Sequence, residues 1–145
     1  MEYLSNKVKI EYAGPLVASA DDTDSDSTVY DMSGFDGVLF FTVITTGADA
    51  AGVATLTVDE NATNATAGGT LITGATATAT NGTTYAGKLL IVDVVKPQER
   101  YVYANRASAT DVMTFGPVFC LRYKGKMGPL SDPDTIAALT AVVGS

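Results

Sequence analysis

Residues 88–123 constrain the fold more than any other part of the chain, because their pattern predicts three consecutive β-strands with two connections. Residues 88–95 form an apolar run that only Asp93 interrupts, and its branched side chains suit a pleated, buried surface. Pro97 ends this run, since proline has no N–H for a ladder and its fixed φ favours a turn. The sequence therefore predicts a hairpin around Pro97.

The two following strands show the period of two that is typical of sheets. In residues 100–106, Tyr101 and Tyr103 fall on one face, and smaller apolar side chains fall on the other. Gly116 and Pro117 then interrupt the apolar pattern, which predicts a bulge or break before the last strand of this block.

Other stretches predict further strands around this block. Residues 7–12 alternate between charged and apolar side chains, as expected of a half-exposed strand. Residues 38–46 form an apolar run typical of a central strand, and residues 53–58 form another alternating strand. We expect residues 71–72 to form a short strand, followed by a low-complexity segment at residues 73–84, rich in Gly, Ala and Thr, that ends in an Asn-Gly turn.

The composition favours one packed domain without helices as its main element. The 145 residues are 46% hydrophobic and 17% charged, which excludes a disordered chain, and β-branched and turn residues dominate. We expect residues 1–130 to form this domain. Residues 131–145 begin with Ser131-Asp132-Pro133, a pattern typical of a helix start, so they form either a short helix or an apolar arm laid on a neighbour.

Charge is unevenly distributed along the chain. The formal net charge is −7, with eleven acidic and two basic residues in positions 1–87, against five acidic and seven basic residues in positions 88–145. Because nucleic acid requires a basic binding surface, this balance disfavours nucleic-acid binding. It leaves room for a charge-complementary contact between copies of the protein or with a partner.

This chain lacks the residues that most catalytic mechanisms need. There is no histidine, Cys120 is the only cysteine, and no phosphate-binding glycine motif occurs. Asp93 and Glu99 remain as a pair of carboxylates, but we expect both to face solvent, one in a strand and one in a turn. We therefore expect a protein that is not an enzyme and that has no cofactor. Cys120 is expected to be buried.

An acidic stretch at residues 21–26 is similar to the start of a calcium-binding loop. Ser27 stands where that pattern requires glycine, and Ser33 stands where it requires glutamate. A solvated connection is the favoured interpretation, and an adventitious cation site is the alternative. The first ten residues lack a signal-peptide pattern, and no apolar run reaches about 20 residues, so we expect neither secretion nor a membrane span.

Three stretches together resemble small structural proteins of tailed bacteriophages: DMSGFDGVLFFTVI at 31–44, GGTLITGATATAT at 68–80 and KLLIVDVVKPQERYVYANR at 88–106. The resemblance implies a virion component, of the kind that decorates the head by binding the major capsid protein. It implies a protein made in the bacterial cytoplasm and located on the capsid surface.

This resemblance and the residue patterns together predict an all-β, antiparallel β-sandwich, jelly-roll-like, that assembles as a homotrimer and binds the capsid through its ends. The candidate partner-binding residues are Tyr3, Lys7, Lys9, Lys124, Lys126, Ile136 and Leu139. A neck or tail connector, which would form a ring of six, is the alternative within the virion. A glycan-binding module is an alternative of a different class, which the lack of tryptophan disfavours.

Overall fold

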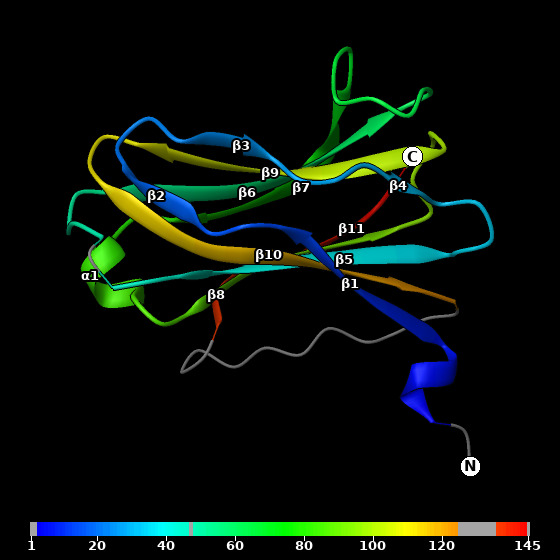
Figure 1. The fold of residues 1–145 in the computed structure, drawn as a ribbon, viewed down its shortest axis with the longest axis horizontal. Coiled ribbons are helices and arrows are strands. Elements are labelled where there is room, and N and C mark those ends of the chain that lie inside the picture. Colours follow the sequence, from blue (N-terminus) through cyan, green and yellow to red (C-terminus); the bar gives the residue numbers. More distant parts are fainter. Residues whose placement is uncertain (1–2, 47, 125–135, 145) are drawn as a thin grey trace.

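A computed structural model describes residues 3–46, 48–124 and 136–144 and shows two β-sheets packed face to face (Figure 1). Sheet A contains β1 (Val8–Gly14), β2 (Val17–Ala20), β5 (Gly37–Ile44), β8 (Leu89–Val95), β10 (Met113–Tyr123) and β11 (Ile136–Val143). Sheet B contains β3 (Asp24–Asp26), β4 (Tyr30–Asp31), β6 (Val53–Asn61), β7 (Thr70–Ala79) and β9 (Tyr101–Ala109). Two short helical turns, η1 (Leu4–Asn6) and α1 (Gly82–Tyr85), complete the described elements.

The strand order is β1-β10-β5-β8-β11 in sheet A, with β2 also paired to β10, and β3-β9-β6-β7 in sheet B, with β4 also paired to β9. The pairing is antiparallel except between β8 and β11. The prediction of an all-β, sandwich-like fold is confirmed.

The core lies between the sheets because strands of both sheets turn alternate apolar side chains toward each other. On β5, Val38, Phe40 and Ile44 are fully buried, and on β6, Leu56 and Val58 are fully buried. Each such side chain contributes about 1.5–3 kcal/mol through removal of apolar surface from water. The strands predicted at residues 38–46 and 53–58 are thus confirmed, and β5 is the central strand of sheet A, as predicted.

The hairpin predicted around Pro97 is wrong. β8 pairs with β5 and β11 in sheet A, whereas β9 pairs with β6, β3 and β4 in sheet B, so the Pro97 connection crosses from one sheet to the other. Lys96 turns the chain with a positive φ of 53°, and its N–H donates to the carbonyl oxygen of Asp36 at 2.8 Å. A short turn-rich connection can link two strands of one sheet or cross between two sheets. The sequence pattern alone therefore does not distinguish a hairpin from a crossing.

Three local predictions also need correction. The strand expected at residues 71–72 is longer than predicted, because β7 runs over Thr70–Ala79 into the low-complexity segment, where its small alanines fit under the facing sheet. The expected Asn-Gly turn is instead the start of α1, where the side chain of Asn81 accepts a hydrogen bond from the N–H of Thr84 at 2.9 Å. Within the acidic stretch, Asp24–Asp26 form a short edge strand, β3, rather than an irregular connection, and Asp24 and Asp26 are exposed to solvent.

The chain's last described segment forms β11, so the short helix, one of the two alternatives for residues 131–145, is wrong over Ile136–Val143. β11 pairs in parallel with β8 of its own chain, and the Thr140 hydroxyl donates to the carbonyl oxygen of Thr76 on β7 at 2.8 Å. β11 thus lies against both sheets along one side of the sandwich (Figure 1). Small, β-branched and apolar residues in this segment satisfy a strand pattern as well as a helical one.

The predicted bulge in β10 is confirmed, and a buried arginine satisfies its backbone. The register of β10 shifts between Phe115 and Val118. Arg106 of β9, only 1% exposed, crosses the core and donates from Nη1 to the carbonyl oxygens of Gly116 and Pro15, both at 2.7 Å. Burial lowers the pKa of Arg106. Because a bulge leaves carbonyl groups without ladder partners, this side chain replaces the missing bonds and joins the two sheets.

Candidate functional site

The structure brings together three of the predicted partner-binding residues at the N-terminal end. Lys7, Lys9 and Lys124 line one shallow hollow of about 290 Å³, with Phe35 at its side. The cluster follows from strand register, because β1 and β10 are paired and the N–H of Lys124 donates to the carbonyl oxygen of Lys7 at 3.3 Å. A basic cluster on a chain of net charge −7 is a distinctive surface feature.

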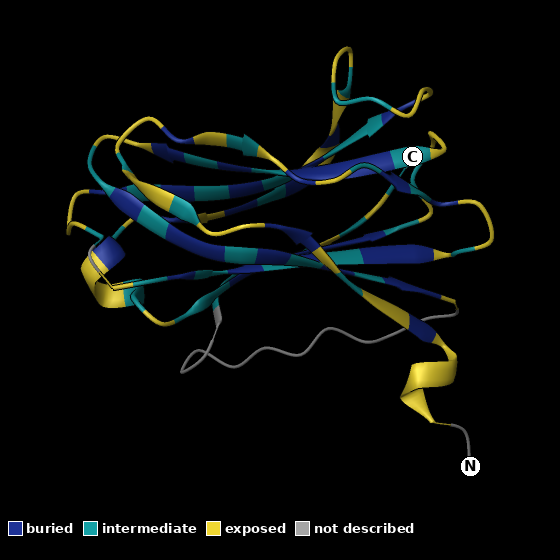
Figure 2. Ribbon diagram, viewed as in Figure 1, coloured by how far each residue is buried: buried dark blue, intermediate teal, exposed yellow. Residues whose placement is uncertain are grey.

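Exposed apolar side chains are concentrated in the N-terminal segment that carries two of these lysines. Seven large hydrophobic residues are exposed among those described, and five of them fall within residues 3–16: Tyr3, Leu4, Ile10, Tyr12 and Leu16. Figure 2 shows η1 as an exposed turn that projects from the sandwich ahead of β1. Single exposed apolar residues are ordinary, but a concentration of this kind in one segment is typical of contact surfaces.

Ile10, Tyr12 and Leu16 were not among the predicted site residues. The alternation in residues 7–12 suggests that the apolar side chains point into the core, whereas Ile10 is 66% exposed and Tyr12 is 59% exposed. Glu11 instead lies on the inner side of the strand, opposite the fully buried Cys120. The inward carboxylate requires a buried partner, and the sequence pattern of β1 alone does not reveal that partner.

That partner is Arg122. Its Nε and Nη2 donate to one oxygen of Glu11 at 3.0 and 2.7 Å, and Lys9 lies 3.1 Å from the other oxygen. Burial acts to raise the pKa of Glu11, but the hydrogen bonds and charges of Lys9 and Arg122 outweigh it, so the pKa is lowered. The guanidinium also stacks on the ring of Phe35, 4.6 Å from its centroid. This network fixes which face of β1 is turned outward.

The outward face of β1 continues an aromatic row on the outer side of sheet A. Tyr12 packs edge-on against Phe119 at 5.9 Å between ring centroids, and Phe119 stacks on Phe41 at 5.2 Å. These three residues are cross-strand neighbours on β1, β10 and β5. Sheet A therefore has aromatic side chains on its outer face as well as an apolar inner face.

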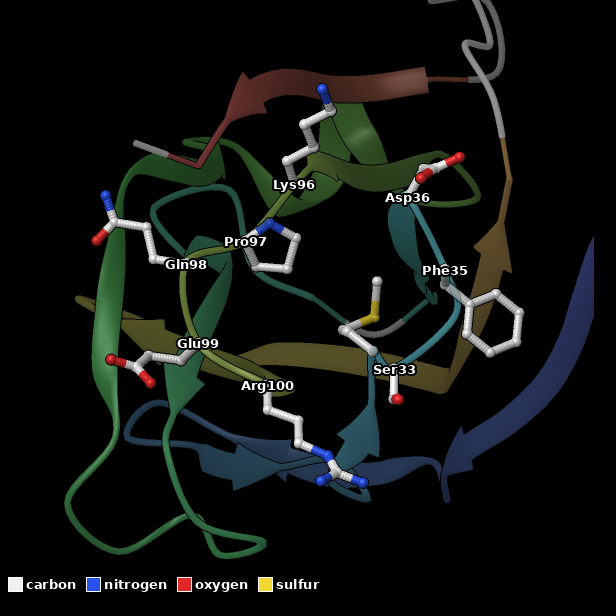
Figure 3. A pocket seen from close by; sticks show the side chains of 9 residues that line it. Ser33, Phe35, Asp36, Lys96, Pro97, Gln98, Glu99 and Arg100 are labelled. Carbon is white, nitrogen blue, oxygen red and sulfur yellow. The ribbon is translucent and has the colours of Figure 1, made fainter.

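A second hollow, of about 430 Å³, lies between the loop before β5 and the connection after β8 (Figure 3). One of its charged groups, the Arg100 guanidinium, is already paired within the chain. Arg100 forms a two-bond ion pair with Asp31 at 3.0 and 2.7 Å, and this pairing, together with the N–H of Ser33, lowers the pKa of Asp31 to about 2. Figure 3 shows Lys96, Glu99 and Arg100 pointing in different directions, so they do not converge on one point.

The two carboxylates weighed as a catalytic pair occupy different environments. Asp93 was expected to face solvent, but it is buried and accepts a hydrogen bond from the Tyr123 hydroxyl. Burial raises the pKa of Asp93, and the bond from Tyr123 partly offsets this effect. Gly37 permits the arrangement, because the Tyr123 ring occupies the place of any side chain at that position. Glu99 is exposed in the Pro97 connection, as expected.

Cys120 is fully buried, as predicted, and burial raises the pKa of its thiol. In the acidic stretch, the side-chain amide of Asn105 donates to carboxylates of both Asp24 and Asp26, at 2.5 and 2.9 Å. Among the described residues, no group of three His, Cys, Asp or Glu side chains could hold a metal ion. Within that same part of the chain, no helix has the length and hydropathy to cross a bilayer.

The remaining predicted site residues are only partly placed. Lys126 lies outside the described residues, and for Ile136 and Leu139 only the backbone, in β11, is described. β11 lies on the opposite side of sheet A from β1, so the structure does not gather all the candidates into one surface.

Comparison with protein-family models, with curated proteins and with solved structures found no match for this chain. Its site is therefore interpreted from its own geometry.

Proposed function

We propose that this protein is a non-enzymatic structural protein of a tailed-bacteriophage virion that binds the major capsid protein as a decoration protein. The observation that carries a binding role is the N-terminal surface, where Tyr3 and Leu4 stand exposed beside the cluster of Lys7 and Lys124. The assignment to a virion rests on the sequence resemblance. The proposed location is the outer surface of the capsid.

The chemistry of this surface suits an acidic, partly apolar partner. Lysines on a chain of net charge −7 attract carboxylates over a distance of about 10 Å at moderate salt, and exposed aromatic side chains then add contact area. Contacts of this size are individually weak. A capsid presents many copies of its subunit, so repeated weak contacts gain strength through effective concentration.

Co-sedimentation with expanded capsids of the parent phage that lack the protein tests this proposal. The wild-type chain is expected to bind saturably, whereas the double variant Lys7→Glu, Lys124→Glu is expected to bind at least tenfold more weakly. The double variant Lys88→Glu, Lys96→Glu is the matched control, because it changes the net charge equally on other parts of the surface. An absence of saturable binding by the wild type would contradict capsid decoration.

A jelly-roll-like topology accompanies the proposed decoration role. The homotrimer predicted from the sequence is one possible assembly of this protein, and a pair of copies is the other. A ring of six copies in solution would instead favour a neck or tail connector.

A further inference from the structure

β1 is an edge strand of sheet A with a row of backbone groups facing outward. The bond from Lys124 to Lys7 identifies that pair as hydrogen-bonded, and in an antiparallel ladder the hydrogen-bonded pairs alternate. Lys7, Lys9 and Glu11 therefore direct their backbone groups to β10. Val8, Ile10 and Tyr12 direct theirs to the free edge.

The outward groups have little to bond with inside the chain. The carbonyl oxygen of Tyr12 accepts a long hydrogen bond of 3.3 Å from the Tyr30 hydroxyl. The pairing of β1 involves only β10 among the described strands, so the outward N–H and C=O of Ile10 have no ladder partner. An edge of this kind, with large apolar side chains, favours pairing with another strand.

We propose that two copies of this protein pair through β1, in antiparallel register, about a two-fold axis at Ile10. In this arrangement Ile10 faces Ile10 of the second copy, and Val8 faces Tyr12 of the second copy. About six new backbone hydrogen bonds result, because each of the three outward residues exchanges two bonds with its partner. A two-fold contact requires a self-complementary surface, and this segment meets that requirement.

Charge selects this register over its neighbours. Pairing about Ile10 places Lys9 opposite Glu11 of the second copy, so both charges meet an opposite charge. A shift that centres the pair on Lys9 opposes two lysines, and a shift that centres it on Glu11 opposes two glutamates. Lysine on an edge strand usually hinders pairing, but here it favours one register.

Two further exposed apolar residues lie at equal sequence separations from Ile10, one on each side. Leu4 and Leu16 lie six positions before and after Ile10, and they are 60% and 67% exposed. Pairing therefore brings the Leu4 end of one copy toward the Leu16 end of the other. In this register the Tyr12 end of each aromatic row meets Val8 of the second copy.

Cysteine substitution tests both the pairing and its register. The single native cysteine, Cys120, is fully buried and does not interfere. Ile10→Cys places two thiols at the two-fold axis, so a short bifunctional thiol reagent is expected to convert most of the protein to a covalent dimer. Tyr12→Cys is the matched control on the same face, since its two thiols are separated by about 13 Å along the strands. Equal crosslinking of both variants, or no crosslinking of Ile10→Cys, would overturn the proposal.

Sedimentation equilibrium supplies an independent readout that distinguishes this dimer from the trimer predicted from the sequence. The chain mass is 15.0 kDa, so the pairing predicts a particle of twice that mass. Ile10→Lys is expected to restore the single-chain mass because it opposes two charges at the axis, whereas Leu71→Lys on β7 is expected to leave the dimer intact. A trimer, a monomer, or a dimer that survives Ile10→Lys would overturn the proposal. None of these outcomes depends on capsid binding.

Discussion

The edge strands β1 and β3 differ in the kind of side chain that they expose. Each ends the strand order of its sheet and leaves backbone groups unpaired. β3 carries Asp24 and Asp26, whose carboxylates accept from Asn105, and such charges oppose pairing with a further strand. β1 instead exposes Ile10 and Tyr12. The difference indicates that the protein protects one edge and leaves the other available for contact.

The largest expected effect concerns Arg106, the side chain that contacts both edges. Its Nη1 donates to the carbonyl oxygen of Pro15, just after β1, and its Nη2 lies 3.4 Å from the Ser25 hydroxyl of β3. Arg106→Ala leaves a cavity and removes buried hydrogen bonds, so the free energy of unfolding is expected to fall by about 3–4 kcal/mol in urea denaturation.

Arg100→Ala is the control for that prediction, because it removes an ion pair that is exposed to solvent and contributes little to stability. If the free energy of unfolding falls by the same small amount in both arginine variants, Arg106 does not join the two edges.

A smaller effect is expected for Glu11, which holds the inner face of β1 on Arg122. Because its folded-state pKa lies below 4.5, the ion pair stabilises the fold above that pH, and the contribution is lost as pH falls through the lowered pKa. Glu11→Gln is expected to cost about 1–2 kcal/mol at pH 7, and this cost is expected to shrink as pH falls through the lowered pKa of Glu11. Urea denaturation at several pH values measures this, with the exposed Glu99→Gln as control. A pH-independent loss would contradict the ion-pair account.

The smallest effect is expected at the protected edge. The double variant Asp24→Thr, Asp26→Thr removes the charges of β3 and supplies residues that favour strands. Self-association through this edge is expected to strengthen about fivefold, corresponding to about 1 kcal/mol. Sedimentation equilibrium of this variant in the Ile10→Lys background isolates the effect from β1. Unchanged association would show that charge is not what protects β3.

Sequence patterns predicted the strands well where apolar periodicity was strong. β5, β6 and the three strands of residues 88–123 were all expected, as was the bulge beside Pro117. The partition of these strands between two sheets was not, because a short connection such as that at Pro97 has the same composition in a hairpin and in a crossing.

The candidate site was predictable only in part. Lys7, Lys9 and Lys124 meet because their strands pair, a relation that needs the register and not only the residue types. The exposure of Ile10 and Tyr12 was not predictable, because it depends on Glu11 turning inward to reach Arg122, 111 positions away in the chain. Long-range ion pairs of this kind override a local alternation of polar and apolar residues.

Backbone amide hydrogen exchange of β1, followed by NMR from dilute to concentrated protein, tests most directly whether this edge is the contact surface. The amides of Lys9 and Glu11 bond to β10 and are expected to be protected at every concentration. Those of Val8, Ile10 and Tyr12 are expected to become at least tenfold more protected as concentration rises, while the amides of β3 stay unchanged. Unchanged exchange at Ile10, or new protection on β3 instead, would contradict the account.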